Sequence, residues 1–145
     1  MLFRSEDALS SGRALDVFLK MVAAQGGDIS VIKDTGLLPR AAVIREVIAG
    51  RDGFVARMDA EKCGIAAGML GAGRETLDSP IDHAAGIVLL KKPGDAVKKG
   101  ETVAMLHTSD EKKIADAKAV FLNGIEFSYE KIKSAPLILG KVGTE

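Results

Sequence analysis

Hydrophobic residues recur with a helical period near the start of the chain. Leu15, Phe18, Leu19 and Val22 have the spacing i, i+3, i+4 and i+7. This spacing places apolar side chains on one face of a helix. Ser10 or Ser11 is the expected N-cap, and Gly26–Gly27 supplies the positive-φ stop. Asp28 is expected to cap a short turn through Ile32, before Gly36 and Pro39 break the chain. The pattern therefore predicts an amphipathic helix with an apolar face to bury.

From Ala41 onward the pattern changes to short apolar runs. Periodicity alone fits either a helix or a strand for Val43, Ile44, Val47 and Ile48. Their β-branched character and the following turn Arg51-Asp52-Gly53 favour a strand. Residues 54–58 are then expected to be its hairpin partner.

The rest of the chain alternates helices with hairpin-type strands. Asp59 is expected to open a helix of small residues through about Leu70, followed by a loop over 71–83. Strands are predicted over 86–90, 96–97, 103–107, 125–128 and 137–139, with turns at 91–95 and 99–100. Thr108 and Glu111 form the pattern of a capping box for a helix to about Leu122, which Asn123–Gly124 ends. This order predicts the α+β class.

Composition limits the classes of function. The chain has 145 residues, with 20 Lys and Arg against 20 Asp and Glu, 16 Gly and no Trp. A balanced charge without a basic block argues against a nucleic-acid partner, and the longest uncharged stretch, 63–73, is too short for a membrane span. One Cys and two His cannot supply a four-ligand zinc site. Charged residues precede any apolar run at the N-terminus, so we expect no signal peptide and a cytoplasmic domain.

Three places in the sequence invite a chemical interpretation. The glycine-rich stretch Gly68–Arg74 follows a predicted helix, whereas backbone amides hold anions best at a helix N-terminus, so a structural turn is favoured. Asp78, Asp82 and His83 lie close together, but no nucleophile accompanies them and turn chemistry is the simpler interpretation. Cys63 on a predicted helix is expected to be a packed residue.

The segment Gly94–Glu101 is more specific. Two glycine turns bracket a short strand, which resembles the corresponding turn of biotinyl and lipoyl carrier domains of the barrel-sandwich type. Lys112 and Lys113 resemble the carrier's modified lysine only loosely, because they enter a capped helix and not an exposed hairpin tip. A carrier function is therefore disfavoured, and a binding or interaction module remains an alternative.

Several stretches, in order, resemble the C-terminal part of the pyrimidine-nucleoside phosphorylase and thymidine phosphorylase family. They are Ala23–Asp28, Leu38-Pro39, Arg51–Val55, Gly64–Ala67, Leu70–Arg74, Ile81–Ile87, and the pattern Gly94-Asp95-x-Val97-x-x-Gly100-Glu101. The match is colinear from about Ser11 to Glu101 and looser afterwards.

This resemblance implies a fold and an activity for the parent enzyme. It implies an α/β-hammerhead domain over 41–145, preceded by a helical segment over 1–40 that is the remnant of an α/β domain. The implied reaction is attack of phosphate on the anomeric carbon of a pyrimidine nucleoside, giving the free base and pentose 1-phosphate. Such a pentosyltransferase is expected to be a homodimer that needs no cofactor, because phosphate is a co-substrate.

The family's phosphate-binding and pyrimidine-reading residues all lie upstream of the part that this chain resembles. We therefore expect no catalytic, cofactor-binding or metal-binding residue in this chain. Phosphorolysis needs an anion clamp and a group that stabilises the departing base, and neither is recognisable here. The prediction is a domain that walls and rigidifies the cleft of a longer enzyme and is inert by itself.

Overall fold

A computed structural model describes residues 2–74, 76–133, 138, 140 and 142–143. The chain divides into two compact units, an N-terminal unit of residues 1–39 and a C-terminal unit of residues 40–145. Among the described residues, no helix has the length and apolar character needed to cross a membrane.

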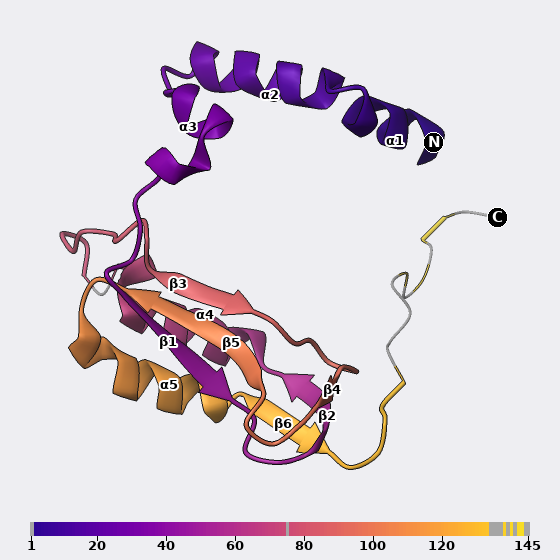
Figure 1. Ribbon diagram of the computed structural model, residues 1–145, viewed down its shortest axis with the longest axis vertical. Helices are drawn as coiled ribbons and strands as arrows, with labels where there is room; N and C mark the ends of the chain where they lie inside the picture. The colour runs from indigo at the N-terminus through magenta and orange to yellow at the C-terminus, as the bar shows by residue number, and fades with distance from the viewer. Residues whose placement is uncertain (1, 75, 134–137, 139, 141, 144–145) are drawn as a thin grey trace. The chain divides into compact units, whose positions relative to one another are not determined.

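The N-terminal unit consists of short helices (Figure 1). They are α1 (Leu2–Ser10), α2 (Arg13–Ala24), α3 (Ser30–Lys33) and the 3-10 turn η1 (Thr35–Leu37). The predicted stop of α2 is confirmed: Gly26 has a φ of 77°, and the N–H groups of Gly26 and Gly27 donate to the carbonyls of Ala23 and Val22. This is the Schellman arrangement, which satisfies carbonyls at the end of a helix.

The predicted N-cap of α2 was wrong. Ser10 and Ser11 lie at the end of a separate helix, α1, and the hydroxyl of Ser11 donates to the carbonyl of Asp7 at 2.5 Å. Gly12, with a φ of 79°, takes the capping position without a side-chain bond. The Asp28 carboxylate, as expected, accepts a hydrogen bond from the N–H of Ser30 at the start of α3 (2.8 Å).

The C-terminal unit contains two antiparallel three-stranded sheets, which confirms the α+β class. One sheet has the order β1-β5-β3 and the other β4-β2-β6. The strands are β1 (Val43–Ile48), β2 (Gly53–Met58), β3 (Gly86–Leu89), β4 (Ala96–Val97), β5 (Thr102–Thr108) and β6 (Ile125–Ser128). The helices are α4 (Ala60–Ala67), its continuation η2 (Gly68–Ala72), the 3-10 turn η3 (Glu111–Lys113) and α5 (Ile114–Leu122).

The predicted hairpin between 43–48 and 54–58 was wrong, because β1 and β2 belong to different sheets. β1 pairs with β5, while β2 lies between β4 and β6. Beyond β1 the chain stays on the β5 side: the N–H of Ala49 donates to the carbonyl of Glu101 and the N–H of Gly100 donates to the carbonyl of Ala49, both at 2.8 Å. Long-range pairing with the buried strand β5 therefore prevails over the local turn signal.

The turns around β4 follow the sequence prediction. Gly94 (φ 97°) and Gly100 (φ 84°) bracket the two-residue strand in the left-handed region that glycine tolerates. The N–H of Gly94 donates to the carbonyl of Val55, which ties the first turn to β2 (2.8 Å). Asp52 accepts from the N–H of Lys99 and ties the second turn to the start of β2 (2.7 Å).

The helices close the core. Asp59 caps α4, as predicted, by accepting from the N–H of Lys62 at 3.1 Å. α5 ends before Asn123–Gly124, also as predicted, and Gly124 lies so close to α4 that an added Cβ would come within 2.9 Å of the Lys62 Cβ. Both helices contribute to one apolar cluster with the sheets; its largest fully buried side chains are Phe121, Leu70, Leu106, Val47, Val55 and Val103.

The capping box predicted from Thr108 and Glu111 was wrong. Asp110 is the N-cap of η3 and accepts from the N–H of Lys112 at 3.0 Å. Thr108 is fully buried at the end of β5, and Glu111 forms an ion pair with Arg45 instead. The strand predicted over 137–139 lies, apart from Ile138, outside the described residues.

Candidate functional site

A surface pocket of about 260 Å³ lies where η2 meets the end of β5 and the start of η3. Its wall combines an apolar floor with a few polar side chains, the usual composition of a small binding site. The lining residues are Leu70, Gly71, Pro80, Ile81, Asp82, Thr108, Ser109, Asp110 and Lys113.

Thr108 joins two of the segments that form the pocket. Its hydroxyl donates to the carbonyl of Leu70 at 2.7 Å and accepts from the N–H of Asp110 at 3.2 Å. Both bonds are made inside the protein, because Thr108 is fully buried. The hydroxyl therefore holds the end of η2 against the start of η3, and its bonding capacity is used within the fold.

Asp82 joins the loop after η2 to the same place. One carboxylate oxygen accepts from the N–H of Ala84 at 2.9 Å and the other from the N–H of Ser109 at 3.1 Å. Hydrogen bonding from Ser109, with a smaller contribution from Ala84, holds the pKa of Asp82 below its usual value. An aspartate with a lowered pKa is ionised at neutral pH and is a weak base, so Asp82 is suited to fastening a loop and poorly suited to proton transfer.

The charges of the pocket do not suit a phosphate. Asp82 and Asp110 contribute two carboxylates against the single ammonium of Lys113. A phosphate-binding site needs an excess of donors and positive charge. This pocket instead has carboxylates that are already bonded to backbone N–H groups, so its chemistry is that of an ordered junction between loops.

The glycine-rich stretch 68–74 presents carbonyls, as expected for a segment that follows a helix. The carbonyl of Leu70 accepts from Thr108, and the carbonyl of Gly71 accepts from the N–H of Asp82 at 2.9 Å. Gly71 has a φ of 116°, and an added Cβ would lie 3.2 Å from the Cβ of Asp82. The glycine thus permits a close turn, and the carbonyls that end this helical segment form a negative dipole end that is unfavourable for an anion.

The other candidates from the sequence are not brought together into a site. His83 and Asp78 are exposed, and neither lines the pocket that contains Asp82. Burial, with a smaller contribution from Asp59, raises the pKa of the Cys63 thiol, which opposes a nucleophilic role and agrees with a packed residue. Lys112 and Lys113 lie in η3 and not at the tip of a hairpin, which argues further against a carrier lysine.

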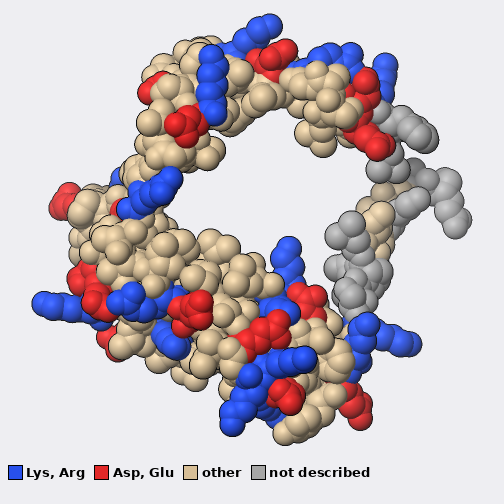
Figure 2. Space-filling model, viewed as in Figure 1, with Lys and Arg blue, Asp and Glu red and all other residues tan. Residues whose placement is uncertain are grey.

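The remaining surface shows no concentration of one charge on the face seen in Figure 2, where acidic and basic side chains alternate. Among the described residues there is no group of three or more His, Cys, Asp or Glu side chains that could hold a metal ion.

Sequence reasoning missed the roles of Thr108 and Ser109 in the pocket wall. No pattern along one chain distinguishes a buried hydroxyl of this kind from a helix cap.

Comparison with known proteins adds the family to this geometry. The family model for the pyrimidine nucleoside phosphorylase C-terminal domain matches residues 54–128. A pyrimidine-nucleoside phosphorylase of Geobacillus stearothermophilus is 43% identical over 137 residues, which cover 94% of this chain and 31% of that protein. Proteins of the same name from Staphylococcus epidermidis and Bacillus subtilis (strain 168) are 39% and 42% identical over 139 and 106 residues.

The chain spans about a third of the length of these relatives: the matched part is 31% of the Geobacillus stearothermophilus protein and 31% of the Staphylococcus epidermidis protein. The matched residues 54–128 contain strands β3 to β6, all of β2 except Gly53, and the helices α4 and α5 of the C-terminal unit. The chain belongs to the family of pyrimidine nucleoside phosphorylase C-terminal domains.

Proposed function

We propose that this chain is the C-terminal portion of a pyrimidine-nucleoside phosphorylase, a pentosyltransferase of nucleoside salvage in the cytoplasm. The complete enzyme would transfer the pentose of a pyrimidine nucleoside to phosphate, releasing the free base. The observation that carries this proposal is the match to phosphorylases over 94% of the chain but only 31% of the relative's length.

Within that enzyme we assign residues 41–145 to an α/β-hammerhead domain. The chain passes from β3 of one small sheet through β4 of the other and back to β5, with a glycine turn on each side of β4, and this supports the assignment. Residues 1–40 are assigned to the end of the preceding α/β domain. The role of the C-terminal domain would be to form and stiffen one wall of the cleft in which nucleoside and phosphate bind.

The apolar face of α2 supports the idea that further polypeptide belongs beside it. Leu15, Phe18 and Met21 are 52%, 45% and 47% exposed, although large side chains of this kind stabilise a fold mainly when buried. Because helices become stable chiefly by packing an apolar face, we propose that this face packs against the upstream part of the phosphorylase. The complete enzyme is expected to be a homodimer, as the family resemblance implies.

The chain by itself is expected to be inactive. Phosphorolysis requires positioned donors for phosphate and a group that stabilises the departing base. The pocket beside Thr108 has an excess of carboxylates, and the glycine-rich turn presents carbonyls. Neither feature supplies the positive charge that the reaction needs.

A chimaeric enzyme tests the proposal. Residues 1–145 would be joined to the upstream two-thirds of the Geobacillus stearothermophilus relative, and thymidine and uridine phosphorolysis would be measured for the chimaera and for the chain alone. We expect turnover only in the chimaera. Turnover of either nucleoside by the isolated chain would refute the assignment, and so would a folded chimaera without activity.

Two substitutions in α2 test the packing of its face within the chimaera. Phe18→Asp places a charge on the apolar face, whereas Lys20→Asp changes an exposed residue on the other side of the helix. We expect Phe18→Asp to lower thermal stability and activity, and Lys20→Asp to leave both within experimental error. Equal effects of the two substitutions would contradict the proposed packing.

A further inference from the structure

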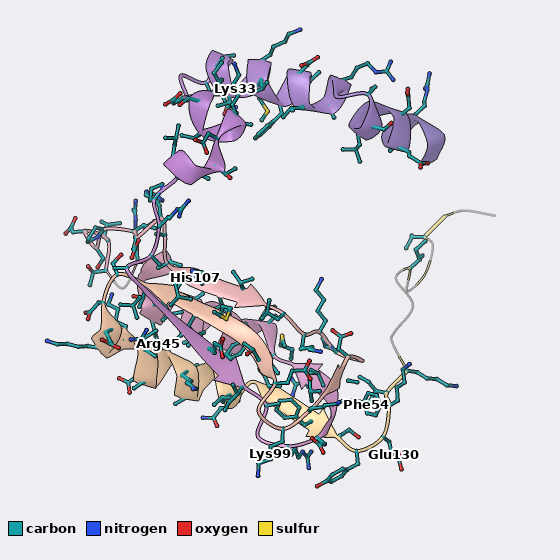
Figure 3. All side chains as sticks on the ribbon, in the orientation of Figure 1. Lys33, Arg45, Phe54, Lys99, His107 and Glu130 are labelled. Atoms are coloured by element: carbon teal, nitrogen blue, oxygen red, sulfur yellow. The ribbon has the colours of Figure 1, made fainter. Side chains whose placement is uncertain are left out.

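The junction between α5 and β6 holds a chemically reactive pair of residues. Asn123 is the only asparagine in the chain, and Gly124 follows it. Asparagine is a thermolabile residue, and a following glycine has no Cβ to shield its backbone nitrogen from the asparagine side chain. Asn123 is exposed whereas Gly124 is buried. The path from α5 through this pair into β6 can be followed in Figure 3, where Glu130 is labelled just beyond the end of β6.

All four backbone polar groups of the pair are hydrogen-bonded within the fold. The N–H groups of Asn123 and Gly124 donate to carbonyls of α5, each at 3.0 Å. The two carbonyls accept from the start of α4. The ammonium of Lys62 donates to the carbonyl of Asn123 at 3.0 Å, and the N–H of Asp59 donates to the carbonyl of Gly124 at 2.8 Å. The pair is therefore fastened both to its own helix and to a neighbouring one.

The packing around Gly124 leaves the backbone little room to move. A Cβ added at Gly124 would come within 2.9 Å of the Lys62 Cβ, so only glycine permits this approach of the junction to α4. The next residue, Ile125, is 8% exposed and pairs with Met58 of β2. A shift of the pair would therefore disturb both the contact with α4 and the first residue pair of β6.

The conformation of Asn123 is unfavourable for attack on its own side chain. A five-membered ring through the Gly124 nitrogen and Cγ of Asn123 closes only when Cβ and this nitrogen lie on the same side of the Cα–C bond, at a ψ of about −120°. Asn123 has a ψ of −14°, so the peptide plane would have to turn by about 100°. That rotation would break the bond from Lys62 and the bond from the N–H of Gly124 to α5.

We propose that Asn123 is a site of spontaneous deamidation that contact with α4 keeps unreactive in the folded chain. When the junction opens, the Gly124 nitrogen loses its proton to a base in solution and bonds to Cγ of Asn123. The bond from Cγ to Nδ2 breaks, and Nδ2 takes up a proton and leaves as ammonia. The product is a cyclic imide, and no atom is oxidised or reduced.

Water then opens the imide in one of two ways. Breaking the bond between the Gly124 nitrogen and Cγ leaves an aspartate at position 123. Breaking the bond to the original main-chain carbonyl carbon leaves an isoaspartate, whose main chain passes through Cβ and Cγ. Isoaspartate therefore lengthens the main chain where Gly124 packs against Lys62. We expect chains with aspartate to refold and chains with isoaspartate to be hindered, so that opening followed by this reaction removes chains irreversibly from the native state.

Protection by the fold is tested on the complete chain. The 145-residue chain and a synthetic peptide of residues 119–131 are incubated in one buffer at mildly alkaline pH, and deamidation at Asn123 is followed by mass spectrometry of tryptic peptides. We expect the folded chain to react at least about tenfold more slowly than the peptide, because only its opened fraction reacts. A smaller ratio overturns the proposal, and so does a peptide that does not deamidate.

Two lysine variants test whether α4 provides the protection. Lys62→Met removes the bond to the carbonyl of Asn123. Lys118→Met is the matched control, because it also removes one positive charge and one bond from a lysine to a backbone carbonyl, that of Glu46 (3.3 Å). We expect Lys62→Met to raise the deamidation rate of the folded chain at least about twofold, and Lys118→Met to change it less. Equal rates in the two variants overturn the role given to α4.

Refolding tests the consequence of the reaction. The chain is held unfolded in guanidinium chloride for increasing times and then diluted, and recovery is followed by circular dichroism. We expect recovery to fall in step with the isoaspartate content at position 123. Asn123→Gln should keep its recovery, because the longer side chain would have to close a six-membered ring. Full recovery of isoaspartate-containing chains, or an equal loss in Asn123→Gln, contradicts the proposed damage.

Discussion

The buried hydroxyl of Thr108 offers a sharp test of how the C-terminal unit is held together. Thr108→Val keeps the size and β-branching of the side chain and removes only the hydroxyl. The carbonyl of Leu70 and the N–H of Asp110 then lose their partner, and Leu70 itself is only 1% exposed, so water cannot readily replace the hydroxyl. Thr108→Ser is the opposite change, because it keeps the hydroxyl and removes a methyl group.

The magnitude follows from the bond to Leu70, because Leu70 is buried whereas Asp110 is exposed and its N–H can bond to water. A lost bond that leaves a buried group unsatisfied costs about 1–3 kcal/mol, so Thr108→Val is expected to lower the free energy of unfolding by about 1–3 kcal/mol. Thr108→Ser should cost about 1 kcal/mol, the contribution of one buried methyl group. For a unit of this size, each kcal/mol corresponds to about 4 °C in Tm. The valine variant should therefore melt about 4–12 °C below the parent chain.

Urea denaturation followed by circular dichroism measures both variants. We expect the midpoint to fall in the order parent, Thr108→Ser, Thr108→Val, with an unchanged dependence of the free energy on urea concentration. A valine variant within about 0.5 kcal/mol of the parent would refute the reasoning, because it would mean that the buried carbonyl of Leu70 finds another partner. A serine variant less stable than the valine variant would show that packing, and not hydrogen bonding, dominates at this position.

Two other predictions follow from a tight turn and from a shifted pKa. Gly53→Ala should destabilise the C-terminal unit by more than about 3 kcal/mol, because Gly53 has a φ of 147° and an added Cβ would lie 2.3 Å from the carbonyl oxygen of Ser128. The control is Gly50→Ala, whose added Cβ meets nothing within 4 Å. In thermal melts the stability of this control should lie within about 0.5 kcal/mol of the parent chain. The folded-state pKa of Asp82 lies below its usual 3.8, so the stabilisation by this carboxylate is complete well above that pH and is lost as the pH falls through it. Asp82→Asn should therefore lower stability at pH 7 but flatten its decline between about pH 5 and 3, and a variant with an unchanged acid decline would contradict this account.

The sequence alone determined much of the local structure, because local chemistry decides it. Gly26–Gly27 was predicted to end a helix, because the left-handed backbone conformation that follows many helices carries a steric cost for every residue type except glycine. Asp59 capped α4, and Gly94 and Gly100 bracketed a short strand, for similar reasons. Family membership was also recognisable from the sequence, since the ordered motifs between Ser11 and Glu101 span much of the region that the family model matches.

The tertiary structure decided what depends on partners distant in sequence. The turn at 51–53 predicted a hairpin between β1 and β2. In the folded chain β1 pairs instead with β5 and β2 with β6, whose residues lie some 50 to 70 positions away. Thr108 read locally as a helix cap and became a buried link to Leu70, 38 residues away. Strand pairing and burial are properties of surfaces that meet only after folding. A single sequence therefore reveals where helices end and turns form, while the choice of neighbours belongs to the folded chain.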